Sequence, residues 1–403
     1  MKIEKKTILI IGGSSESIPG IIEAKKKFNV ILVDKSPEAP GIKYSDFFIN
    51  ESTYNPKKIY NKLFKLKYKI NGVISLNSDV PYTVSYISNK LGLNSLSLKS
   101  SKILSDKFLM KSFFKKNNIN TADFYLINNY SLFREKVKLY KKFVIKPCDS
   151  RGARGVFLLK NNSKKLKKYY LKTLKISKKK LLLFEEYLEG PQLSTESIIV
   201  DGKCFTIGIS DRNYEKLSEY CPSIIEDGSD MPSIFQKDFK KKIDFVMQKV
   251  ANKLNLKNGT LKGDLLIKNN EIYIIEIAGR LSGGFFSSIM IPNHNNINLI
   301  KSALNICLGK KIKKPVIKIN RFITQRYLFS KQTGRIKNIK FPEWIKITNK
   351  IIFFELNIKK NFYVSKITDH SKRLGQVIVR GKSRKDAVNY AKKIIDSIKI
   401  EFY

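Results

Sequence analysis

The chain has 403 residues and a mass of 46.5 kDa, which suggests two to four domains, and 42% of its residues are apolar, close to the globular norm. No stretch approaches the roughly 18 uninterrupted apolar residues that a membrane span requires. Its net charge is +44, yet only 11 of the 78 basic residues are arginines and the lysines are spread along the whole chain, as on solvated faces, so charge alone does not indicate a specific nucleic-acid partner.

Cysteine and histidine usage does not indicate a disulfide framework or a histidine-rich metal site. The 4 cysteines form no CxxC pair, and 2 histidines are too few for a multi-histidine site. Basic residues precede the apolar run Thr7–Gly12, but the run leads into glycines and serines without a cleavage-type site. We therefore expect a buried first strand rather than a signal peptide, and a cytoplasmic protein without membrane association.

Short apolar runs alternate with amphipathic segments in the N-terminal part. We expect strands at Thr7–Gly12, Val30–Val33 and Gly72–Leu76, with helices at Ile18–Phe28 and Pro56–Lys67 between them. This alternation predicts a doubly wound parallel sheet.

Small and polar residues follow these predicted strands, namely Gly12–Ser15, Asp34 and Asp79. Ligands of doubly wound sheets bind at the carboxyl ends of the strands, so we expect these residues near a cleft. The first turn lacks the G-x-G-x-x-G fingerprint of dinucleotide-binding proteins. We therefore interpret it as a tight turn between strand and helix rather than as a dinucleotide site.

The remaining sequence predicts a mixed α+β arrangement. Amphipathic helices are expected at Lys99–Asn118 and Lys237–Lys253, and the chain ends in a predicted helix at Arg384–Ile398. The strands expected between and after them are Phe143–Lys146, Val156–Leu159, Leu181–Phe184, Ser197–Val200, Phe205–Ile209, Gly263–Ile267, Ile272–Ile277, Arg321–Leu328, Ile351–Leu356 and Gly375–Val379.

A lysine followed by a loop of small residues is the first of three features that suggest nucleotide chemistry. Lys146 ends an apolar run, and the loop Cys148–Gly155 with its two glycines follows. Backbone N–H groups can approach phosphate oxygens where side chains are small, and the lysine adds a positive charge. The pattern is typical of a polyphosphate-binding loop, and also of an ordinary glycine-rich turn.

An apolar strand that breaks into acidic residues is the second feature. Leu181–Phe184 is followed by Glu185, Glu186, Tyr187 and Leu188. A hinge of this kind can present backbone groups to the edge of a purine. An ordinary strand end with solvated glutamates has the same pattern.

A pair of carboxylates in a predicted hairpin is the third and most specific feature. Asp264 and Glu276 lie on the two strands, and a turn at Asn269-Asn270 would bring them together on one face. Carboxylates among apolar neighbours are costly unless they bind a cation or pair with a base. Mg²⁺ prefers carboxylates together with phosphate oxygens, so the pair is a candidate Mg·ATP site, with a structural salt bridge to Arg280 as the alternative.

The order of these features resembles the ATP-grasp superfamily of ligases, and the resemblance extends over essentially the whole chain. It is greatest to the branch that contains the L-amino-acid ligases, carbamoyl-phosphate synthase, biotin carboxylase and the purine-pathway ligases. It implies an α/β and α+β fold: a Rossmann-like pre-ATP-grasp domain at 1–98, a two-lobed ATP-grasp domain at 99–309 with a lid lobe at about 140–188, and a small C-terminal α+β domain at 310–403 that completes the grasp fold.

The resemblance also implies roles for individual residues. Lys107 and Lys146 resemble the two lysines that contact the phosphates of ATP, and Arg280 resembles the arginine over the reacting phosphate, so Arg280 and Lys146 are the predicted catalytic residues. Asp264 and Glu276 match the ligands of Mg²⁺, a site that Mn²⁺ also suits. The other predicted nucleotide-binding residues are Ser150, Gly152 and Gly155 in the phosphate loop, Glu185, Glu186 and Leu188 in the adenine hinge, and Gln192 at the ribose.

Two positions depart from the pattern of the family. Gln192 stands where a glutamate usually holds the ribose hydroxyls, and Ala278 stands where an asparagine usually supplies a third metal ligand. These departures leave the number of metal ions open. They also support an alternative, a non-catalytic nucleotide-binding sensor.

What the resemblance implies is activation of a carboxylate as an acyl phosphate by ATP, followed by attack of an amine. Small-molecule carboxylate and amine substrates are the expected partners, and dimerisation is common among similar proteins. The enzymatic alternative is a bicarbonate-using carboxylase or carbamoyl-phosphate-type ligase, and a polyanion-binding protein rests on charge alone. The unranked candidates for the substrate pocket are Glu196, Arg212, Ser282, His294 and Arg326.

Overall fold

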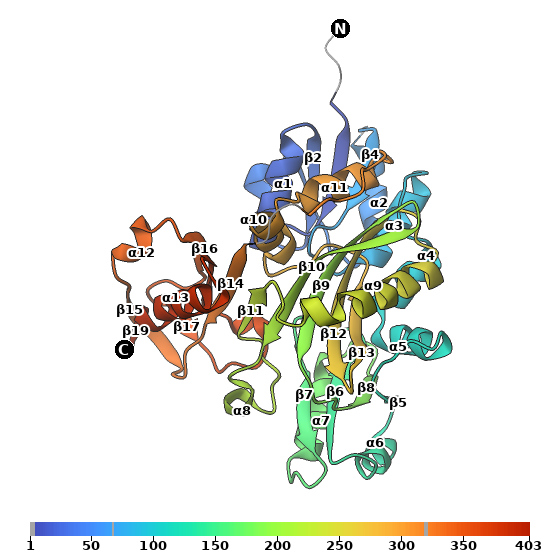
Figure 1. The fold of residues 1–403 in the computed structure, drawn as a ribbon. Helices are drawn as coiled ribbons and strands as arrows, with labels where there is room; N and C mark the ends of the chain where they lie inside the picture. The colour runs from blue at the N-terminus through green and yellow to red at the C-terminus, as the bar shows by residue number, and fades with distance from the viewer. Residues whose placement is uncertain (1–4, 67, 318–320) are drawn as a thin grey trace.

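The computed structural model describes residues 5–66, 68–317 and 321–403. Within these ranges a parallel sheet lies at one end of the molecule, a small lobe lies at the other end, and a long antiparallel sheet lies between them (Figure 1). The C-terminal residues extend the long sheet at one edge. No helix of the described residues is long and apolar enough to cross a membrane.

The parallel sheet has the strand order β3-β2-β1-β4, and helices cover both of its faces. Ile8 and Ile10 face one core with α1 and α11, whereas Leu9 and Ile11 face another with α2 and α3. The predicted doubly wound sheet is therefore confirmed, while the last residue predicted for the helix Pro56–Lys67 lies outside the described residues. The elements are β1 (Thr7–Ile11), α1 (Ile18–Lys25), β2 (Asn29–Asp34), β3 (Phe47–Asn50), α2 (Pro56–Lys65), β4 (Ile70–Ile74), α3 (Pro81–Lys90) and α11 (Leu299–Cys307).

The helix expected at Lys99–Asn118 is wrong in one respect, because the structure has two helices there, α4 (Leu98–Ser105) and α5 (Lys107–Lys116). Asp106 between them is extended, with φ −131° and ψ 121°. Its carboxylate accepts hydrogen bonds from the N–H groups of Phe108 and Leu109, which caps α5. The cap places Lys107 at the first position of α5.

The small lobe is an antiparallel sheet with the strand order β5-β8-β6-β7. Its core contains stacked aromatic side chains, such as Phe143 and Phe184 with ring centroids 4.5 Å apart. The sheet includes β5, which lies upstream of residue 140. The elements are β5 (Phe124–Ile127), α6 (Tyr130–Val137), β6 (Lys142–Pro147), β7 (Phe157–Lys160), α7 (Leu166–Ile176) and β8 (Leu182–Glu186).

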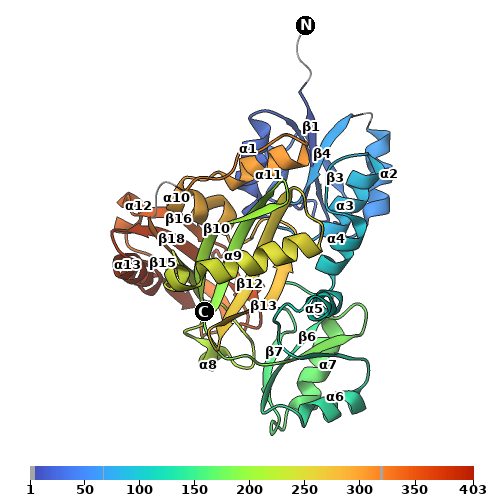
Figure 2. The ribbon, with the colours of Figure 1, turned by 45° about the vertical axis from the view of Figure 1, so that its right-hand side comes forward.

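The long sheet has the strand order β13-β12-β9-β10-β11-β14-β18-β16, so strands from the C-terminal part extend the central ones. Helix α9 lies across the strands β9, β10, β12 and β13 (Figure 2), and its residues Ile243, Met247 and Val250 pack in their core. The central elements are β9 (Gln192–Val200), β10 (Lys203–Asn213), α8 (Leu217–Tyr220), β11 (Gly228–Met231), α9 (Gln236–Lys253), β12 (Gly259–Lys268), β13 (Glu271–Ala278) and α10 (Ile291–Asn295).

The C-terminal residues add strands to the long sheet and form a short sheet of their own, with the order β17-β15-β19. Helix α13 packs against β14 and β18 through Ala387, Ala391 and Ile394. The elements are β14 (Phe322–Leu328), β15 (Gly334–Lys340), α12 (Trp344–Ile347), β16 (Ile351–Leu356), β17 (Tyr363–Val364), β18 (Gly375–Gly381), α13 (Arg384–Ser397) and β19 (Lys399–Phe402).

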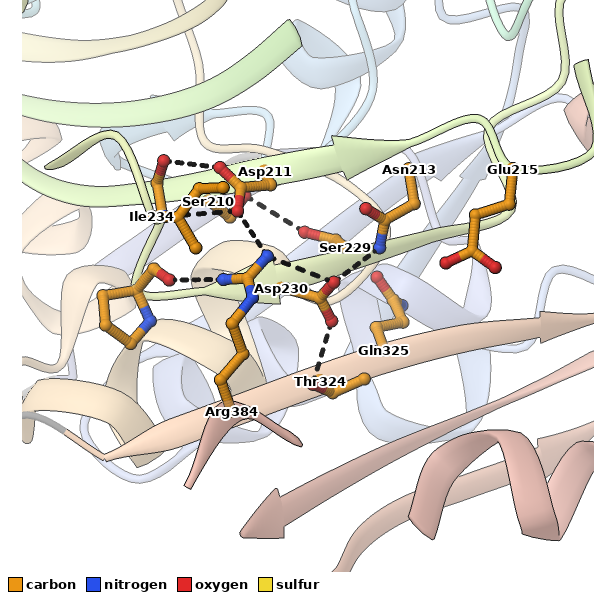
Figure 3. A network of polar contacts seen from close by, with 12 residues as sticks. Ser210, Asp211, Asn213, Glu215, Ser229, Asp230, Ile234, Thr324, Gln325 and Arg384 are labelled. Atoms are coloured by element: carbon orange, nitrogen blue, oxygen red, sulfur yellow. Dashed lines mark hydrogen bonds and ion pairs between the residues drawn. The ribbon is translucent and has the colours of Figure 1, made fainter. Parts of the chain in front are cut away.

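A buried polar network joins the C-terminal part to the central strands (Figure 3). Asp230 of β11 accepts hydrogen bonds from Arg326 of β14 at 2.8 and 3.1 Å and from Thr324 at 2.9 Å. Arg384, at the start of α13, bonds Asp211 of β10 and lies 3.4 Å from Asp230. Arg326 and Asp230 are 5% and 3% exposed, so each charge depends on its partner.

This dependence predicts that Asp230→Asn destabilises the protein by about 3–5 kcal/mol, because it leaves the buried Arg326 without a full counter-charge. Urea denaturation followed by circular dichroism measures the change. The matched control is Asp244→Asn, which removes a partly exposed i,i+4 pair with Lys240 and is expected to cost less than about 0.5 kcal/mol. Equal costs for the two variants would contradict this account of the network.

Candidate functional site

A cavity of about 560 Å³ lies where the N-terminal sheet, the small lobe and the long sheet meet. Nearly all of the predicted site residues line it. They are Lys107, Lys146, Ser150, Gly152, Glu185, Glu186, Leu188, Gln192, Asp264, Glu276 and Arg280.

Among the residues predicted to bind the nucleotide and the metal, Gly155 is the one that does not line the cavity. Its φ is +73°, and a Cβ there would lie 3.0 Å from Ile176 and 3.1 Å from Pro147. Gly155 therefore allows a backbone conformation and a close approach to Ile176 and Pro147 that the loop requires, and it does not face the cavity. Cys148 does not line the cavity either, and burial raises the pKa of its thiol to about 12, as for a cysteine that only packs.

The hairpin of β12 and β13 pairs Asp264 directly with Glu276. The strands are joined by Asn269 and Asn270, whose φ values of 50° and 59° are those of a tight hairpin turn that suits asparagine. The predicted register is thus confirmed, and the two carboxylates lie side by side at the cavity wall.

Three lysines form ion pairs with glutamates on the small-lobe side of the cavity. Lys107 Nζ lies 2.7 Å from Glu276 Oε1, and Lys146 Nζ lies 2.8 Å from Glu185 Oε2. Lys111, one turn after Lys107 on α5, lies 3.3 Å from Glu185 Oε1 and is only 2% exposed. These pairs neutralise charges that would be costly to bury alone.

The pKa values follow from this packing. Burial raises the pKa of Glu276, but the charges of Lys107 and Lys146 outweigh it and hold that pKa well below its ordinary range. Burial lowers the pKa of Lys111 to about 8, although Glu185 opposes the shift. Near neutral pH the cavity therefore holds ionised carboxylates beside ammonium groups, which is an arrangement suited to a polyanionic ligand with a cation.

Asp264 is held by groups from β9, from β10 and from its own strand, β12. It accepts a hydrogen bond from Ser194 Oγ at 3.2 Å, lies 3.0 Å from Arg212 Nη1 and contacts Lys262. Arg212 in turn lies 3.3 Å from Glu226, to which Arg373 also binds. This part of the cavity extends from Asp264 toward the C-terminal residues.

Asp79, just beyond β4 of the N-terminal sheet, contacts two arginines, Arg151 in the loop between β6 and β7 and Arg280 after β13. Arg151 Nε lies 2.7 Å from Asp79 Oδ2, and Arg280 Nε lies 3.6 Å from Asp79 Oδ1. The carbonyl oxygen of Gly152 accepts a hydrogen bond from the N–H of His370 at 3.2 Å. The loop is thus held from both the N-terminal and the C-terminal parts of the chain.

The candidates for the substrate pocket divide into two groups. Arg212 and Ser282 line the cavity, whereas Glu196, His294 and Arg326 do not. His294 Nδ1 lies 2.6 Å from the carbonyl oxygen of Arg321, and Arg326 binds Asp230. Glu196 lies just beneath the cavity wall, where it accepts hydrogen bonds from Ser282 N at 2.9 Å and from Ser287.

Several lining residues were not predicted, among them Lys111, Arg151, Glu226, Lys262 and Arg373. Helical spacing could have found Lys111, because residues four apart share a helix face, and strand alternation could have found Lys262, two residues before Asp264. Glu226 and Arg373 come from segments far apart in the chain, and no local signal marks them.

The chemistry of the donor set fits a magnesium ion that also binds phosphate. Asp264 and Glu276 offer adjacent carboxylate oxygens, and Mg²⁺ takes one or two carboxylates together with phosphate oxygens and water. The described residues contain no group of three or more His, Cys, Asp or Glu side chains that could hold a metal by themselves. Any metal here would therefore depend on the ligand for the rest of its coordination.

Two family models match the chain. An ATP-grasp domain matches residues 104–284, and the L-amino acid ligase C-terminal domain 2 matches residues 326–403. No curated protein sequence is detectably similar to the chain.

Solved structures with the same fold are numerous. The L-amino acid ligase from Bacillus licheniformis has a TM-score of 0.83 at 16% identity, with 100% of both chains covered. The phosphoribosylglycinamide synthetase from Anaerococcus prevotii has a TM-score of 0.76 at 19% identity, covering 99% of this chain and 100% of that one. The biotin carboxylase domain dimer of the Hydrogenobacter thermophilus 2-oxoglutarate carboxylase, crystallised with MgADP, ADP and bicarbonate, has a TM-score of 0.75 at 13% identity, covering 99% and 91%. At these identities the comparisons establish the fold alone.

Burial of Glu196 generates a pH-dependent prediction. Burial raises the pKa of this carboxyl from 4.5 to about 7, against the hydrogen bonds from Ser282 and Ser287. A group whose pKa is raised on folding contributes stability that is full below the unfolded pKa and is lost as pH rises through the folded pKa. Between pH 4.5 and 7 the free energy of unfolding of the protein should therefore fall by about 3 kcal/mol relative to that of Glu196→Gln. The glutamine keeps a hydrogen-bond acceptor but has no charge.

Urea denaturation of the protein and of Glu196→Gln at pH 5 and pH 8 measures this difference. The comparison of the two proteins cancels the titration of all other groups. A stability difference that is the same at both pH values would show that Glu196 does not titrate in this range.

Proposed function

We propose that the protein is an ATP-dependent carboxylate–amine ligase, because an ATP-grasp domain model matches residues 104–284 and the L-amino acid ligase C-terminal domain 2 matches residues 326–403. In this proposal a carboxylate is activated as an acyl phosphate and coupled to an amine, with release of ADP and phosphate. The observation that most supports it is the match to the ligase C-terminal domain over residues 326–403, because it favours amino acids over bicarbonate as substrates.

The nucleotide would bind between the small lobe and the long sheet. Lys107 and Lys146 would exchange part of their contact with Glu276 and Glu185 for phosphate oxygens. The N–H of Leu188 and the side-chain amide of Gln192 make no hydrogen bond to the described residues, which supports an adenine hinge and a ribose contact at these positions. Gly152, with φ +65° and open space around it, allows the loop to approach the phosphates.

Asp264 and Glu276 would hold the metal ion. When bound, Mg²⁺ supplies positive charge that draws electron density from the phosphate oxygens. Arg212 and Lys262, which neutralise Asp264, would then be partly released toward the other ligands of the cavity. The absence of a third side-chain ligand at Ala278 supports a single metal ion held by two residues and the nucleotide.

Arg280 would stabilise the charge that develops on the transferring phosphoryl group. It comes from the loop after β13, and Asp79 holds its guanidinium close to the cavity. Positioning and electrostatics of this kind account for most of the catalysis in phosphoryl transfer, so the reaction needs no covalent nucleophile.

The carboxylate and the amine would occupy the part of the cavity nearest the C-terminal residues. Arg212 and Arg373 both bind Glu226 there, and the Arg373 guanidinium lies 3.5 Å from the centre of the Tyr327 ring. These arginines offer counter-charges for a substrate carboxylate, and the neighbouring Glu16 offers one for an amino group.

The same proposal keeps the three predicted domains at 1–98, 99–309 and 310–403. The small lobe then begins with β5 rather than at residue 140. The long sheet crosses the last of these boundaries, because β14, β16 and β18 pair with the central strands.

Phosphate release from MgATP, screened against single amino acids, pairs of amino acids and bicarbonate, tests the function. We expect phosphate release with an acid–amine pair. The rate of release should fall at least about 100-fold in Lys146→Ala, because the substitution removes the buried ammonium group that would contact the phosphates. Lys142→Ala, at the exposed start of the same strand, is the matched control and should keep full activity.

Three other outcomes of this screen would argue against the proposal. Release with bicarbonate alone would favour a carboxylase, and binding of ADP without turnover on any substrate would favour a sensor. Full activity of Lys146→Ala would overturn the assignment of the phosphate site.

A further inference from the structure

A second cavity, of about 630 Å³, lies on the other side of Ser78 and Arg280 from the first one. Helix α3, the segment between α9 and β12, and the segment after α11 form its walls. These parts lie around the N-terminal sheet, far from the small lobe (Figure 1). The two cavities are thus separate but share Arg280 as part of their walls.

Ser85 on α3 supplies an unsatisfied polar group to this second cavity. The residue is 1% exposed, lines the cavity, and its hydroxyl has no hydrogen-bond partner in the described chain. A buried hydroxyl without a partner is unfavourable, so a partner from outside the chain would satisfy it. Ser88, on the same helix, is also buried and unpartnered but does not line the cavity.

The charges around this cavity are mostly positive. Lys257, Lys310 and Lys311 lie at its exposed rim and Arg280 in its wall, whereas Asp201 is the only acidic residue among the described residues that line it. The ammonium groups of Lys257 and Lys311 make no hydrogen bond or ion pair within the described chain. Such free donors are available to an anion.

We propose that the second cavity binds a small molecule that carries a carboxylate or a phosphate group. The rim lysines would attract its charge, and the Ser85 hydroxyl would hydrogen-bond its inner end. Because Arg280 also faces the first cavity, an occupant would lie next to the arginine assigned to the ligase reaction. The binding itself goes beyond the ligase reaction and does not require turnover.

Equilibrium dialysis of the full chain with radiolabelled succinate or inorganic phosphate, at constant ionic strength, tests the proposal. The neutral diamide of succinic acid serves as a control for binding that does not depend on charge. The measurement is made with and without MgADP, because phosphate could also enter the first cavity. We expect one saturable site per chain for at least one of the two anions, retained in the presence of MgADP.

Matched variants locate the site. Ser85→Ala should weaken binding about two- to tenfold, whereas Ser88→Ala should leave it unchanged. The double variant Lys257→Gln/Lys311→Gln should weaken anion binding about threefold or more. The control double variant Lys167→Gln/Lys168→Gln, on the exposed face of α7, should not weaken it. Removal of either unpartnered hydroxyl should not lower thermal stability, so a loss of folding does not obscure the result.

Binding of succinate but not phosphate would assign a carboxylate ligand, and the reverse would assign a phosphate ligand. No saturable binding of either anion would overturn the proposal, as would equal binding of the neutral diamide. Equal weakening by both members of a variant pair would also overturn it. A failure of the ligase proposal would appear separately, as a lack of turnover with anion binding intact.

Discussion

The central constraint of this structure is that several carboxylates are placed in or beside one cavity and must be neutralised there. Glu276, Glu185 and Asp264 each contact at least one lysine or arginine. The charges of these partners hold the pKa values of Glu276 and Glu185 below their ordinary range. Two of these carboxylates have more than one cationic partner: Glu185 contacts two lysines, and Asp264 contacts Arg212 and Lys262. A ligand that carries both phosphate groups and a divalent cation would offer each of these charges a new partner, which is the physical basis for proposing MgATP here.

The fold meets this constraint by bringing three sheets to the same point. The N-terminal parallel sheet contributes Asp79 at its carboxyl edge, the small lobe contributes Lys146 and its glycine loop, and the β12–β13 hairpin contributes Asp264 and Glu276. The C-terminal strands extend the long sheet and bring Arg373 to the far end of the cavity. The buried pair of Asp230 and Arg326 ties that part to the central strands, so the far end of the cavity depends on it.

Much of the fold and the core of the candidate site follow from local sequence patterns. Apolar runs that alternate with amphipathic segments predict the parallel sheet, and Asn269-Asn270 between two strands predicts the register that pairs Asp264 with Glu276. Hydrophobic periodicity continues across Asp106 and therefore predicts one helix, whereas the extended backbone of Asp106 ends α4 and its carboxylate caps the start of α5. Glu226 and Arg373 could not be predicted, because only long-range packing brings them together. No local pattern assigns chemical roles to the site residues, and those roles follow only from the resemblance to a family.

Calorimetric titration of ADP, with and without Mg²⁺, into the protein and into Glu276→Gln tests the central claim most directly. If Glu276 exchanges Lys107 for a metal ion, Mg²⁺ should tighten ADP binding to the protein by at least about tenfold, or about 1.4 kcal/mol. In Glu276→Gln this magnesium effect should be lost, while binding without Mg²⁺ should be no weaker because Lys107 is free to meet the phosphates. ADP binding that responds neither to Mg²⁺ nor to the substitution would contradict the account.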